Sequence, residues 1–246
     1  MPISQFELEF KEVKTSKTAL PVVIVAAGNS SRMKGMDKQE QLILGLPVLV
    51  RTLKAFEQSD KISKIVVATK EEKINLMYNL AEKYGITKLY KVVCGGENRE
   101  ESVKNGLKEL SIGNKKALVH DGARPLVSQD VISRVVTALE TEECVVCGIK
   151  VKDTIKRVDA NGYAVETLNR DELISVQTPQ GVNIEKFLKV AEKLPLDKFT
   201  DDASVLEALG ERVKIVEGDQ KNIKITTPED IALAESYLRE GLENEY

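Results

Sequence analysis

Short apolar runs alternate with longer amphipathic stretches along most of this chain. Residues 21–28, PVVIVAAG, form an apolar run that ends in glycine, which is typical of a buried strand in a parallel sheet. Residues 47–58, which open on a proline, place Leu49, Leu53 and Phe56 at helical spacing. The same alternation continues, and it predicts strands at 63–69, 89–96, 116–120 and 144–151, with helices at 71–85, 99–110 and 128–143 between them.

This alternation of strands and helices predicts an α/β fold. Short loops between the elements imply right-handed crossovers, and therefore a doubly wound, mostly parallel sheet of Rossmann-like type with helices on both faces. Ligands of such sheets bind beyond the carboxyl ends of the strands, near the point where the strand order reverses. Functional residues should therefore follow strands.

The pattern changes after the fifth predicted strand. Residues 153–168 indicate two strands around the turn residues 159–162, DANG, and this β-hairpin would leave the sheet as an arm. We expect an N-terminal extension over residues 1–20 and a single domain over 21–242, with the arm inserted at about 152–170. The remaining segments predict strands at 173–177, 212–218 and 222–226, and helices that begin near Asn183, at Asp201 and at Thr227.

The composition excludes several classes of active site. The 246 residues are 42% hydrophobic and 30% charged, as in a soluble globular protein, and the net charge of −3 favours neither nucleic acid nor an anionic membrane. The chain has one histidine, so a Ser/His/Asp triad would have to use His120. Three cysteines are too few for a disulfide scaffold, and a zinc site of His and Cys would need nearly all of these residues. The chemistry is therefore expected to depend on Lys, Arg, Asp and backbone amides.

The cysteines and the N-terminus indicate a reducing compartment. The first 20 residues lack the apolar run of a signal peptide, so we expect a cytoplasmic protein. Cys144 and Cys147 form a C-x-x-C, which suggests redox or metal chemistry, but positions i and i+3 of a strand face opposite ways. We interpret both as thiols of the core.

The loop after the first strand carries the first candidate site. Gly28 lets backbone amides approach an anion, and Arg32, Lys34 and Lys38 add positive charge, which together suit a triphosphate. The loop lacks the G-K-[ST] of a Walker motif and is not G-x-G-x-x-G. The alternative is an ordinary basic surface loop.

Two more predicted strands end in candidate motifs. Residues 94–102, CGGENREES, combine a glycine pair with the start of a helix, where Arg99 and Ser102 stand, although a glycine turn and a helix cap would explain them equally. After the fourth strand, Asp121 precedes Gly, Ala and Arg, so it could hold Mg²⁺ against phosphate oxygens. The alternative for Asp121 is a turn with an arginine partner.

The arm and the end of the chain add charged residues with ordinary alternatives. The arm carries phosphate-binding residue types, but a charged hairpin is more often a solvated face. Residues 200–204, TDDAS, could be only a helix cap, and Lys224, between apolar neighbours, faces either solvent or a site.

Taken in this order, the motifs resemble those of the 2-C-methyl-D-erythritol 4-phosphate cytidylyltransferase family. The matching segments run from about Val22 to Leu238 and are AAGNSSRM, DKQ, LGLPVLVRTL, GGENREESVKNGL, LVHDGARP, VKDTIKR, VQTPQG, TDDASVLEALG and NIKITTPEDIALAE. The resemblance implies a nucleotidyltransferase fold that dimerises through the arm, CTP and a polyol phosphate as substrates, Mg²⁺ as cofactor, and pyrophosphate as product.

The resemblance also implies roles for individual residues. Arg32, Lys38 and Lys224 would be catalytic, stabilising charge at the reacting phosphates, and Asp121 would hold the metal. Thr154 and Arg170 would reach from the arm into the partner's site to bind the sugar phosphate, together with Lys224 and Arg124. The residues implied around CTP are Ala26, Ala27, Gly28, Gly96, Glu97, Arg99, Ser102 and Asp121. The chain departs from the usual family pattern at Ser30, Asp37, Glu40 and Gly122 but keeps Arg32 and Lys38.

The implied reaction needs no imidazole. The phosphate of the polyol, already an anion at neutral pH, would attack the α-phosphorus of CTP in line, so positioning and charge stabilisation lower the barrier. We expect His120 to support the site structurally, because strand alternation turns it away from the face of Asp121. A ribitol 5-phosphate cytidylyltransferase, a non-catalytic CTP-binding regulator and a metal-dependent hydrolase are the alternatives.

Overall fold

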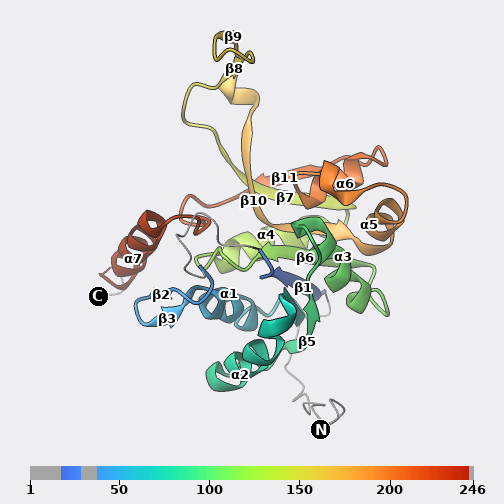
Figure 1. Ribbon diagram of the computed structural model, residues 1–246, viewed down its shortest axis with the longest axis vertical. Helices are drawn as coiled ribbons and strands as arrows, with labels where there is room; N and C mark the ends of the chain where they lie inside the picture. The colour runs from blue at the N-terminus through green and yellow to red at the C-terminus, as the bar shows by residue number, and fades with distance from the viewer. Residues whose placement is uncertain (1–17, 29–37, 244–246) are drawn as a thin grey trace.

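A seven-stranded sheet forms the centre of the computed structural model, which describes residues 18–28 and 38–243, with side chains up to residue 240. The strand order is β11-β7-β10-β6-β1-β4-β5, and every pairing is parallel except those of β10, which runs antiparallel to both β6 and β7. The predicted mostly parallel sheet is therefore confirmed (Figure 1). Its strands are β1 (Leu20–Val25), β4 (Ile62–Thr69), β5 (Leu89–Cys94), β6 (Lys116–Asp121), β7 (Cys144–Lys150), β10 (Ile174–Asn183) and β11 (Lys214–Glu217).

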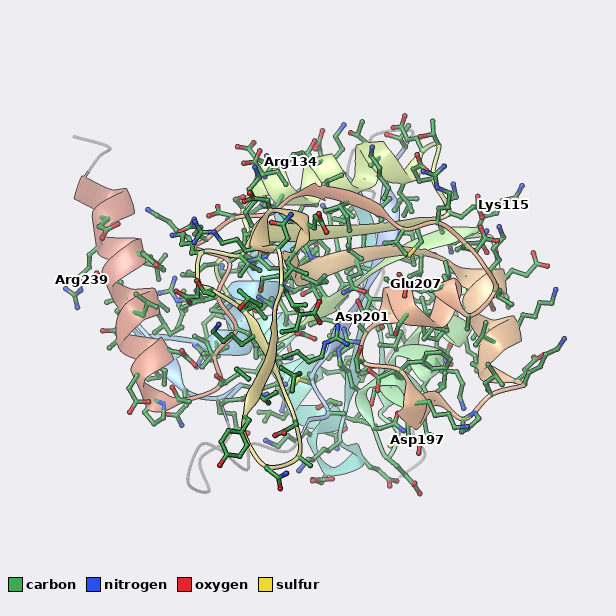
Figure 2. All side chains as sticks on the ribbon, turned by 90° about the horizontal axis from the view of Figure 1, so that it is seen from above. Lys115, Arg134, Asp197, Asp201, Glu207 and Arg239 are labelled. Atoms are coloured by element: carbon green, nitrogen blue, oxygen red, sulfur yellow. The ribbon has the colours of Figure 1, made fainter. Side chains whose placement is uncertain are left out.

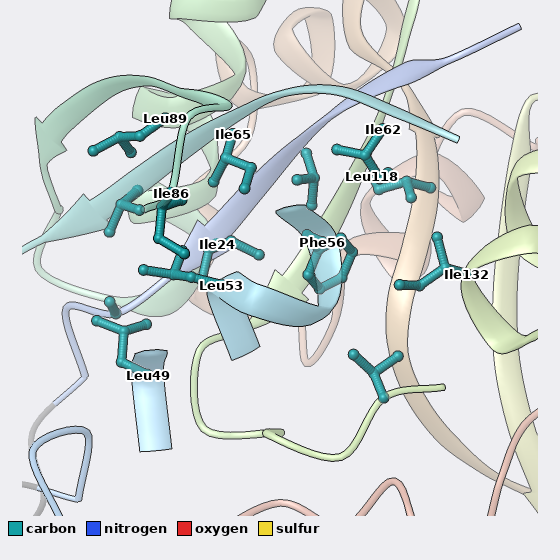
Figure 3. Packing of buried hydrophobic residues seen from close by; sticks show 14 of the residues in the cluster. Ile24, Leu49, Leu53, Phe56, Ile62, Ile65, Ile86, Leu89, Leu118 and Ile132 are labelled. Carbon is teal, nitrogen blue, oxygen red and sulfur yellow. The ribbon is translucent and has the colours of Figure 1, made fainter. Parts of the chain in front are cut away.

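Helices cover both faces of this sheet, as the alternation predicts. One buried cluster joins α1, α2 and α4 to the sheet, and a second cluster joins α3, α5 and α6 to the opposite face. In the first, Ile24, Leu53 and Phe56 are buried side by side with their neighbours (Figure 3). The helices are α1 (Val48–Glu57), α2 (Ile74–Tyr84), α3 (Arg99–Leu110), α4 (Gln129–Leu139), α5 (Ile184–Ala191), α6 (Asp202–Glu207) and α7 (Pro228–Glu243).

The strand order reverses beside β1, and this places the carboxyl ends of β1 and β6 together. The chain passes from β1 to β4 and β5 on one side, whereas β6 lies on the other side of β1. Val25 and Asp121, the last residues of the two strands, are paired in register. Loops that leave the two strands diverge from this point, which is where doubly wound sheets bind ligands.

Local signals explain several helix boundaries. Asn98 caps α3 by accepting a hydrogen bond from the amide of Glu101 at 2.8 Å, and Gly85 ends α2 in the left-handed conformation at φ 66°. The expected first turn at Pro47 needs a small correction, because Pro47 is the N-cap and α1 begins one residue later.

Three parts of the sheet prediction were wrong or incomplete. Residues 222–226 form no strand and instead pass the end of β6, where the amide of Ile225 donates to the carbonyl of Ala123 at 2.8 Å. The strand predicted at 173–177 runs on to Asn183 as β10. A hairpin of β2 (Leu42–Ile43) and β3 (Leu46–Pro47) was not predicted, because strands of two residues leave no alternating pattern.

The predicted arm is present. Its strands β8 (Lys156–Val158) and β9 (Ala164–Thr167) pair only with each other, and all their residues are exposed. Figure 1 shows the hairpin projecting far from the sheet beyond β7 and β10. In the described part of the chain, no helix combines the length and the apolarity that a membrane span requires.

Cys144 and Cys147 lie on opposite faces of β7, as strand alternation predicts. Cys147 belongs to the cluster with α1, α2 and α4, and Cys144 to the cluster with α3, α5 and α6. Burial raises the pKa of each thiol to about 12. Both are therefore thiols of the core, and they do not converge on a shared metal or disulfide site.

Candidate active site

A cavity of about 600 Å³ opens at the carboxyl ends of β1, β5 and β6. Ala26 lies outside it, because this residue is buried and its amide donates to Ala68 of β4 at 2.7 Å. Arg32 falls outside the described residues. The other residues predicted around the nucleotide and the reacting phosphates line this cavity: Ala27, Gly28, Lys38, Gly96, Glu97, Arg99, Ser102, Asp121 and Lys224.

Glycines at the end of β5 let two loops approach closely in the floor of this cavity. A Cβ atom on Gly95 would lie 2.4 Å from the Cβ of Ala27 and 2.9 Å from the Oγ of Ser102. The amide of Gly96 donates to the same Ser102 hydroxyl at 3.0 Å, and that hydroxyl donates to the carbonyl of Asn98 at 2.9 Å. Ser102 therefore fixes the glycine loop against the first turn of α3.

Three cations surround the carboxylate of Asp121. Lys224 Nζ lies 2.8 Å from one oxygen, Arg99 Nε donates to the other at 3.0 Å, and Arg124 Nε lies 3.7 Å away. Burial would raise the pKa of Asp121, but these cations outweigh burial and hold that pKa well below its usual range. Asp121 is therefore ionised at every physiological pH.

Sequence reasoning missed the partner of Arg99. Asp202, in the first turn of α6, accepts hydrogen bonds from both terminal nitrogens of Arg99, at 2.9 and 2.8 Å. Residues 200–204 were predicted only as a helix cap, and Asp201 does form a capping box with Ser204. The pairing of Asp202 joins residues 103 positions apart, so no local signal identifies it.

A second cavity of about 600 Å³ lies on the other side of this ionic cluster. Arg99, Asp121 and Lys224 line both cavities, so they form a shared wall. Arg124, Thr178, Gln180 and other polar residues from β10 and the start of α6 line the second cavity. Seen from the side of the arm, Asp201 lies towards the middle of the molecule, and Glu207 lies beside it (Figure 2).

One side of the second cavity is apolar. Val146 of β7 and Ile215 of β11 are paired in register, and Val213 lies on the same face two residues before Ile215. Val176 of β10 also lines the cavity. The cavity thus combines the cations Arg99, Arg124 and Lys224 with an apolar strip, which suits a phosphate attached to a small organic group.

The comparisons with known proteins agree with this geometry. The family model described as IspD, 2-C-methyl-D-erythritol 4-phosphate cytidylyltransferase, matches residues 20–240. The chain belongs to this family. Relatives named 2-C-methyl-D-erythritol 4-phosphate cytidylyltransferase include one from Bacillus cereus, 43% identical over 221 residues (89% of this chain and 97% of the relative). Another, from Clostridium botulinum, is 43% identical over 220 residues, or 88% of this chain and 96% of the relative.

Solved structures of IspD proteins share the fold. The 4-diphosphocytidyl-2C-methyl-D-erythritol synthase of Anaerococcus prevotii has a TM-score of 0.77 at 30% identity, covering 90% of this chain and 97% of that structure. The 2-C-methyl-D-erythritol 4-phosphate cytidylyltransferase of Thermus thermophilus has a TM-score of 0.71 at 28% identity, with coverages of 90% and 99%. The predicted family and the α/β fold are thereby confirmed.

The IspD motif residues of the arm do not reach either cavity of their own chain. Thr154 and Arg170 are exposed, and Arg170 Nη1 donates to the carbonyl of Lys152 at 2.8 Å across the base of the arm. Neither residue lines either of these two cavities.

The donor set fits a metal that is held mostly by a nucleotide. Among the described residues, no three His, Cys, Asp or Glu side chains converge on one point. Mg²⁺ is commonly bound by one or two carboxylates together with substrate phosphates and water. Asp121 supplies one carboxylate at the wall of the first cavity, whereas Asp202 is fully buried and lines neither cavity.

His120 is part of the support of this IspD site. It is fully buried on the face opposite Asp121, with its ring centroid 4.8 Å from that of Phe56. Its Nε2 contacts the carbonyl of Arg124 at 3.2 Å, and its Nδ1 contacts the hydroxyl of Thr178 at 3.0 Å. That hydroxyl accepts the amide hydrogen of Asp121 at 3.1 Å. A neutral ring with its hydrogen on Nε2 satisfies all three contacts.

Proposed function

We propose that this chain transfers CMP from CTP to 2-C-methyl-D-erythritol 4-phosphate, forming 4-diphosphocytidyl-2-C-methyl-D-erythritol and pyrophosphate. This is the activity of the IspD family in the non-mevalonate route to isoprenoids. The observation that supports it most is the pair of cavities that meet at Arg99, Asp121 and Lys224. Two substrates placed in them would react across that wall.

The first cavity is the proposed site of CTP. The loops at Ala27, Gly28 and Gly96 approach one another closely enough for backbone amides to surround phosphates. Glu97 and Ser102 lie at the start of α3, where the proposal places the cytosine and ribose. Lys38 lines the same cavity, and we assign Lys38 and Arg32 to the charge that builds at the α-phosphate.

The second cavity is the proposed site of the polyol phosphate. Its phosphate would lie at the cationic wall, near Lys224 and Arg124, where it faces the first cavity. The polyol would extend along the strip of Val146, Val213 and Ile215, which offers an apolar contact for the C-methyl branch. Ribitol phosphate has no such branch, so the strip favours the methylerythritol substrate.

Catalysis by these residues is a matter of position and charge. The attacking phosphate oxygen is an anion at neutral pH, so no general base is required. His120 is poorly placed to serve as one, since it is fully buried and its two ring nitrogens are engaged by the Arg124 carbonyl and the Thr178 hydroxyl. Lys224 would orient the acceptor phosphate, while Lys38 and Arg32 stabilise the negative charge of the transition state.

Asp121 is the proposed ligand of Mg²⁺. When bound there, the ion would neutralise phosphate oxygens of CTP and of the departing pyrophosphate. Arg99, Lys224 and Arg124 keep the Asp121 carboxylate ionised, which is the form that binds a metal ion. The donor set described above supports this assignment.

A homodimer formed through the arm would complete the site. The arm exposes three apolar side chains on one hairpin, Val158, Tyr163 and Val165, at 59%, 72% and 59% of their surface, and a group of exposed apolar side chains is typical of an interaction surface. In a dimer, Thr154 and Arg170 from one chain would reach the polyol phosphate bound by its partner. Their exposure and their separation from both cavities of their own chain support this arrangement.

Pyrophosphate release tests the proposal. The purified chain is incubated with Mg²⁺ and each of CTP, ATP, GTP and UTP, crossed with methylerythritol phosphate and ribitol phosphate. We expect release with CTP and methylerythritol phosphate, accompanied by the CDP-polyol. Binding of CTP without release for any polyol would instead identify a regulator, and pyrophosphate without a CDP-polyol would identify a hydrolase.

Variants of the loop then test the assigned roles. Lys38→Ala and Arg32→Ala should each lower kcat by about a hundredfold or more, the usual effect of removing one donor to a developing charge. Thermal unfolding of both variants should match that of the wild type. Near-normal turnover in both variants would refute the assignment.

A further inference from the structure

The structure contains a buried carboxylate beside the two cavities that lines neither of them. Asp202 is 0% exposed, although it is an ionisable residue in the first turn of a short helix. Burying an isolated charge is costly, so such groups need close partners. Asp202 has one, because both of its oxygens accept hydrogen bonds from the guanidinium of Arg99 at 2.9 and 2.8 Å.

Arg99 connects this carboxylate to the shared wall. The terminal nitrogens of Arg99 face Asp202, and its Nε donates to Asp121 at 3.0 Å. The guanidinium is planar and rigid, so fixing one edge against Asp202 fixes the direction in which the other edge points. The position of the Asp121 carboxylate therefore depends on a residue that lines neither cavity.

Asp202 is itself held firmly. The side-chain oxygen of Gln180 on β10 accepts the amide hydrogen of Ala203 at 3.0 Å, and the amide nitrogen of Gln180 donates to Asp201 at 3.2 Å. Asp201 caps the same turn through the amide of Ser204 at 3.0 Å. These bonds tie the first turn of α6 to the sheet, so Asp202 is a fixed anchor for Arg99.

Asp202 is one of three carboxylates in ionic contact with the cations at the wall. Arg99, Arg124 and Lys224 supply three positive charges. The carboxylates in contact with them are Asp121, Asp202 and Glu100, the last at 3.6 Å from Arg99. Without Asp202, Arg99 would keep ionic contacts only with Asp121 at 3.0 Å and Glu100 at 3.6 Å, so its guanidinium would be free to turn towards Asp121.

We propose that Asp202 is a positioning residue, which acts through Arg99 to hold the carboxylate of Asp121 at the wall where the two cavities meet. The inference rests on the proposed function, because its readout is transfer of CMP to methylerythritol phosphate. Asp202 touches no substrate in this proposal. Its removal should therefore lower kcat more than it weakens the binding of either substrate.

The test is Asp202→Asn, which keeps the shape of the side chain and removes its charge. We expect kcat to fall about 10- to 100-fold, the effect of misplacing a reacting group. The KM values for CTP and methylerythritol phosphate should change less than about threefold. Asn183→Ala is the matched control, because it removes the side-chain cap of the neighbouring helix α5, lowering Tm but leaving kcat unchanged.

A second variant tests whether Asp202 acts through Arg99. Lysine cannot bridge two carboxylates as arginine does, so Arg99→Lys should lower kcat as Asp202→Asn does. The double variant should be no slower than the slower single variant, since the two residues act as one unit. If Asp202→Asn does not fold, Arg99→Lys alone tests the proposal. A kcat of Arg99→Lys within twofold of wild type would refute it.

Three results would overturn the inference. The first is a kcat of folded Asp202→Asn within twofold of wild type. The second is a double variant whose loss of kcat equals the product of the losses of the two single variants. The third is a rise in the KM of Asp202→Asn without a fall in its kcat. If the wild type itself forms no CDP-polyol, the proposed function fails, and this result is distinct because it appears before any variant is made.

Discussion

Acid should destabilise this protein through its one histidine, and replacing that histidine should remove most of the effect between pH 8 and pH 5. His120 is fully buried, with Nε2 directed at the carbonyl of Arg124 and Nδ1 at the hydroxyl of Thr178. Burial, the largest influence, lowers the pKa of His120 from 6.5 to about 3. The folded state therefore keeps the ring neutral at pH values where the unfolded chain protonates it.

The sign and size follow from proton linkage. The stability contributed by the neutral ring is fully present above pH 6.5 and is lost progressively as the pH falls towards 3. One pKa unit corresponds to about 1.4 kcal/mol, so at pH 5 the loss amounts to roughly 2 kcal/mol. For a chain of this length, that loss lowers Tm by roughly 4–8 °C.

Urea unfolding at pH 8, 7, 6 and 5 measures this loss in the wild type and in His120→Gln. The variant should be less stable at pH 8, because its side chain fits the cavity of the imidazole less well. Its stability should nevertheless depend less on pH, by about 2 kcal/mol over the range. Carboxyl groups such as Glu100, whose pKa burial raises, titrate in both proteins and cancel in the comparison.

Two observations would refute this reasoning. Parallel stability curves for wild type and variant would mean that His120 has the same pKa in the folded and unfolded states. Titration of the single histidine ring signal near pH 6.5 in the folded protein, followed by NMR, would mean that the ring is not held neutral. We expect the chemical shift of the ring signal to stay constant between pH 8 and pH 5.

Three further predictions concern the cavities and the thiols. Lys224→Met should lower kcat by about a hundredfold or more, because it removes a cation beside both cavities; pyrophosphate release above a tenth of the wild-type rate would contradict this. Gly95→Ala should lower the free energy of unfolding, measured with urea, by about 1–3 kcal/mol, and calorimetry should show weaker CTP binding, because the new Cβ would lie 2.4 Å from the Cβ of Ala27. Unchanged binding would show that the loop at Gly95 shifts to admit the extra methyl group. In the native protein, Ellman's reagent should label Cys94 and spare Cys144 and Cys147, and CTP should slow that labelling; equal labelling of all three thiols would exclude the buried arrangement.

Local patterns predicted the helices better than the sheet. The expected helix at 99–110 coincides with α3, because the cap at Asn98 and the amphipathic spacing both belong to the segment itself. The strand at 173–177 was predicted too short, since Thr178 and Gln180 are polar residues buried by partners far away in the sequence. A polar residue of this kind is indistinguishable from a loop residue until its partner is known.

The wrong strand at 222–226 has a different cause. Ile225 is buried and Ile223 partly buried, but they pack with α7 and the β2–β3 hairpin rather than against a neighbouring strand. The alternation was thus caused by a satellite core and not by a sheet. The alternation left open whether Lys224, between the two isoleucines, faces solvent or a site, and the structure places it against Asp121 at 2.8 Å.

The candidate site was predictable as far as its motifs follow strands. Gly96, Arg99 and Asp121 come together because the parallel strands before them end at one edge of the sheet. Asp202 could not be found in this way, because its importance depends on a contact across the fold. Arg32 lies outside the described residues, so its place remains a prediction.

The wall shared by the two cavities makes the binding of the two proposed substrates interdependent. Any rearrangement of Arg99, Asp121 or Lys224 around one ligand changes the surface that the other meets. If CTP alters the affinity for methylerythritol phosphate by some factor, the polyol must alter the affinity for CTP by the same factor. A thermodynamic cycle of four dissociation constants would measure that coupling free energy directly. It would show whether these three side chains make the two substrates cooperate or compete before any bond is formed.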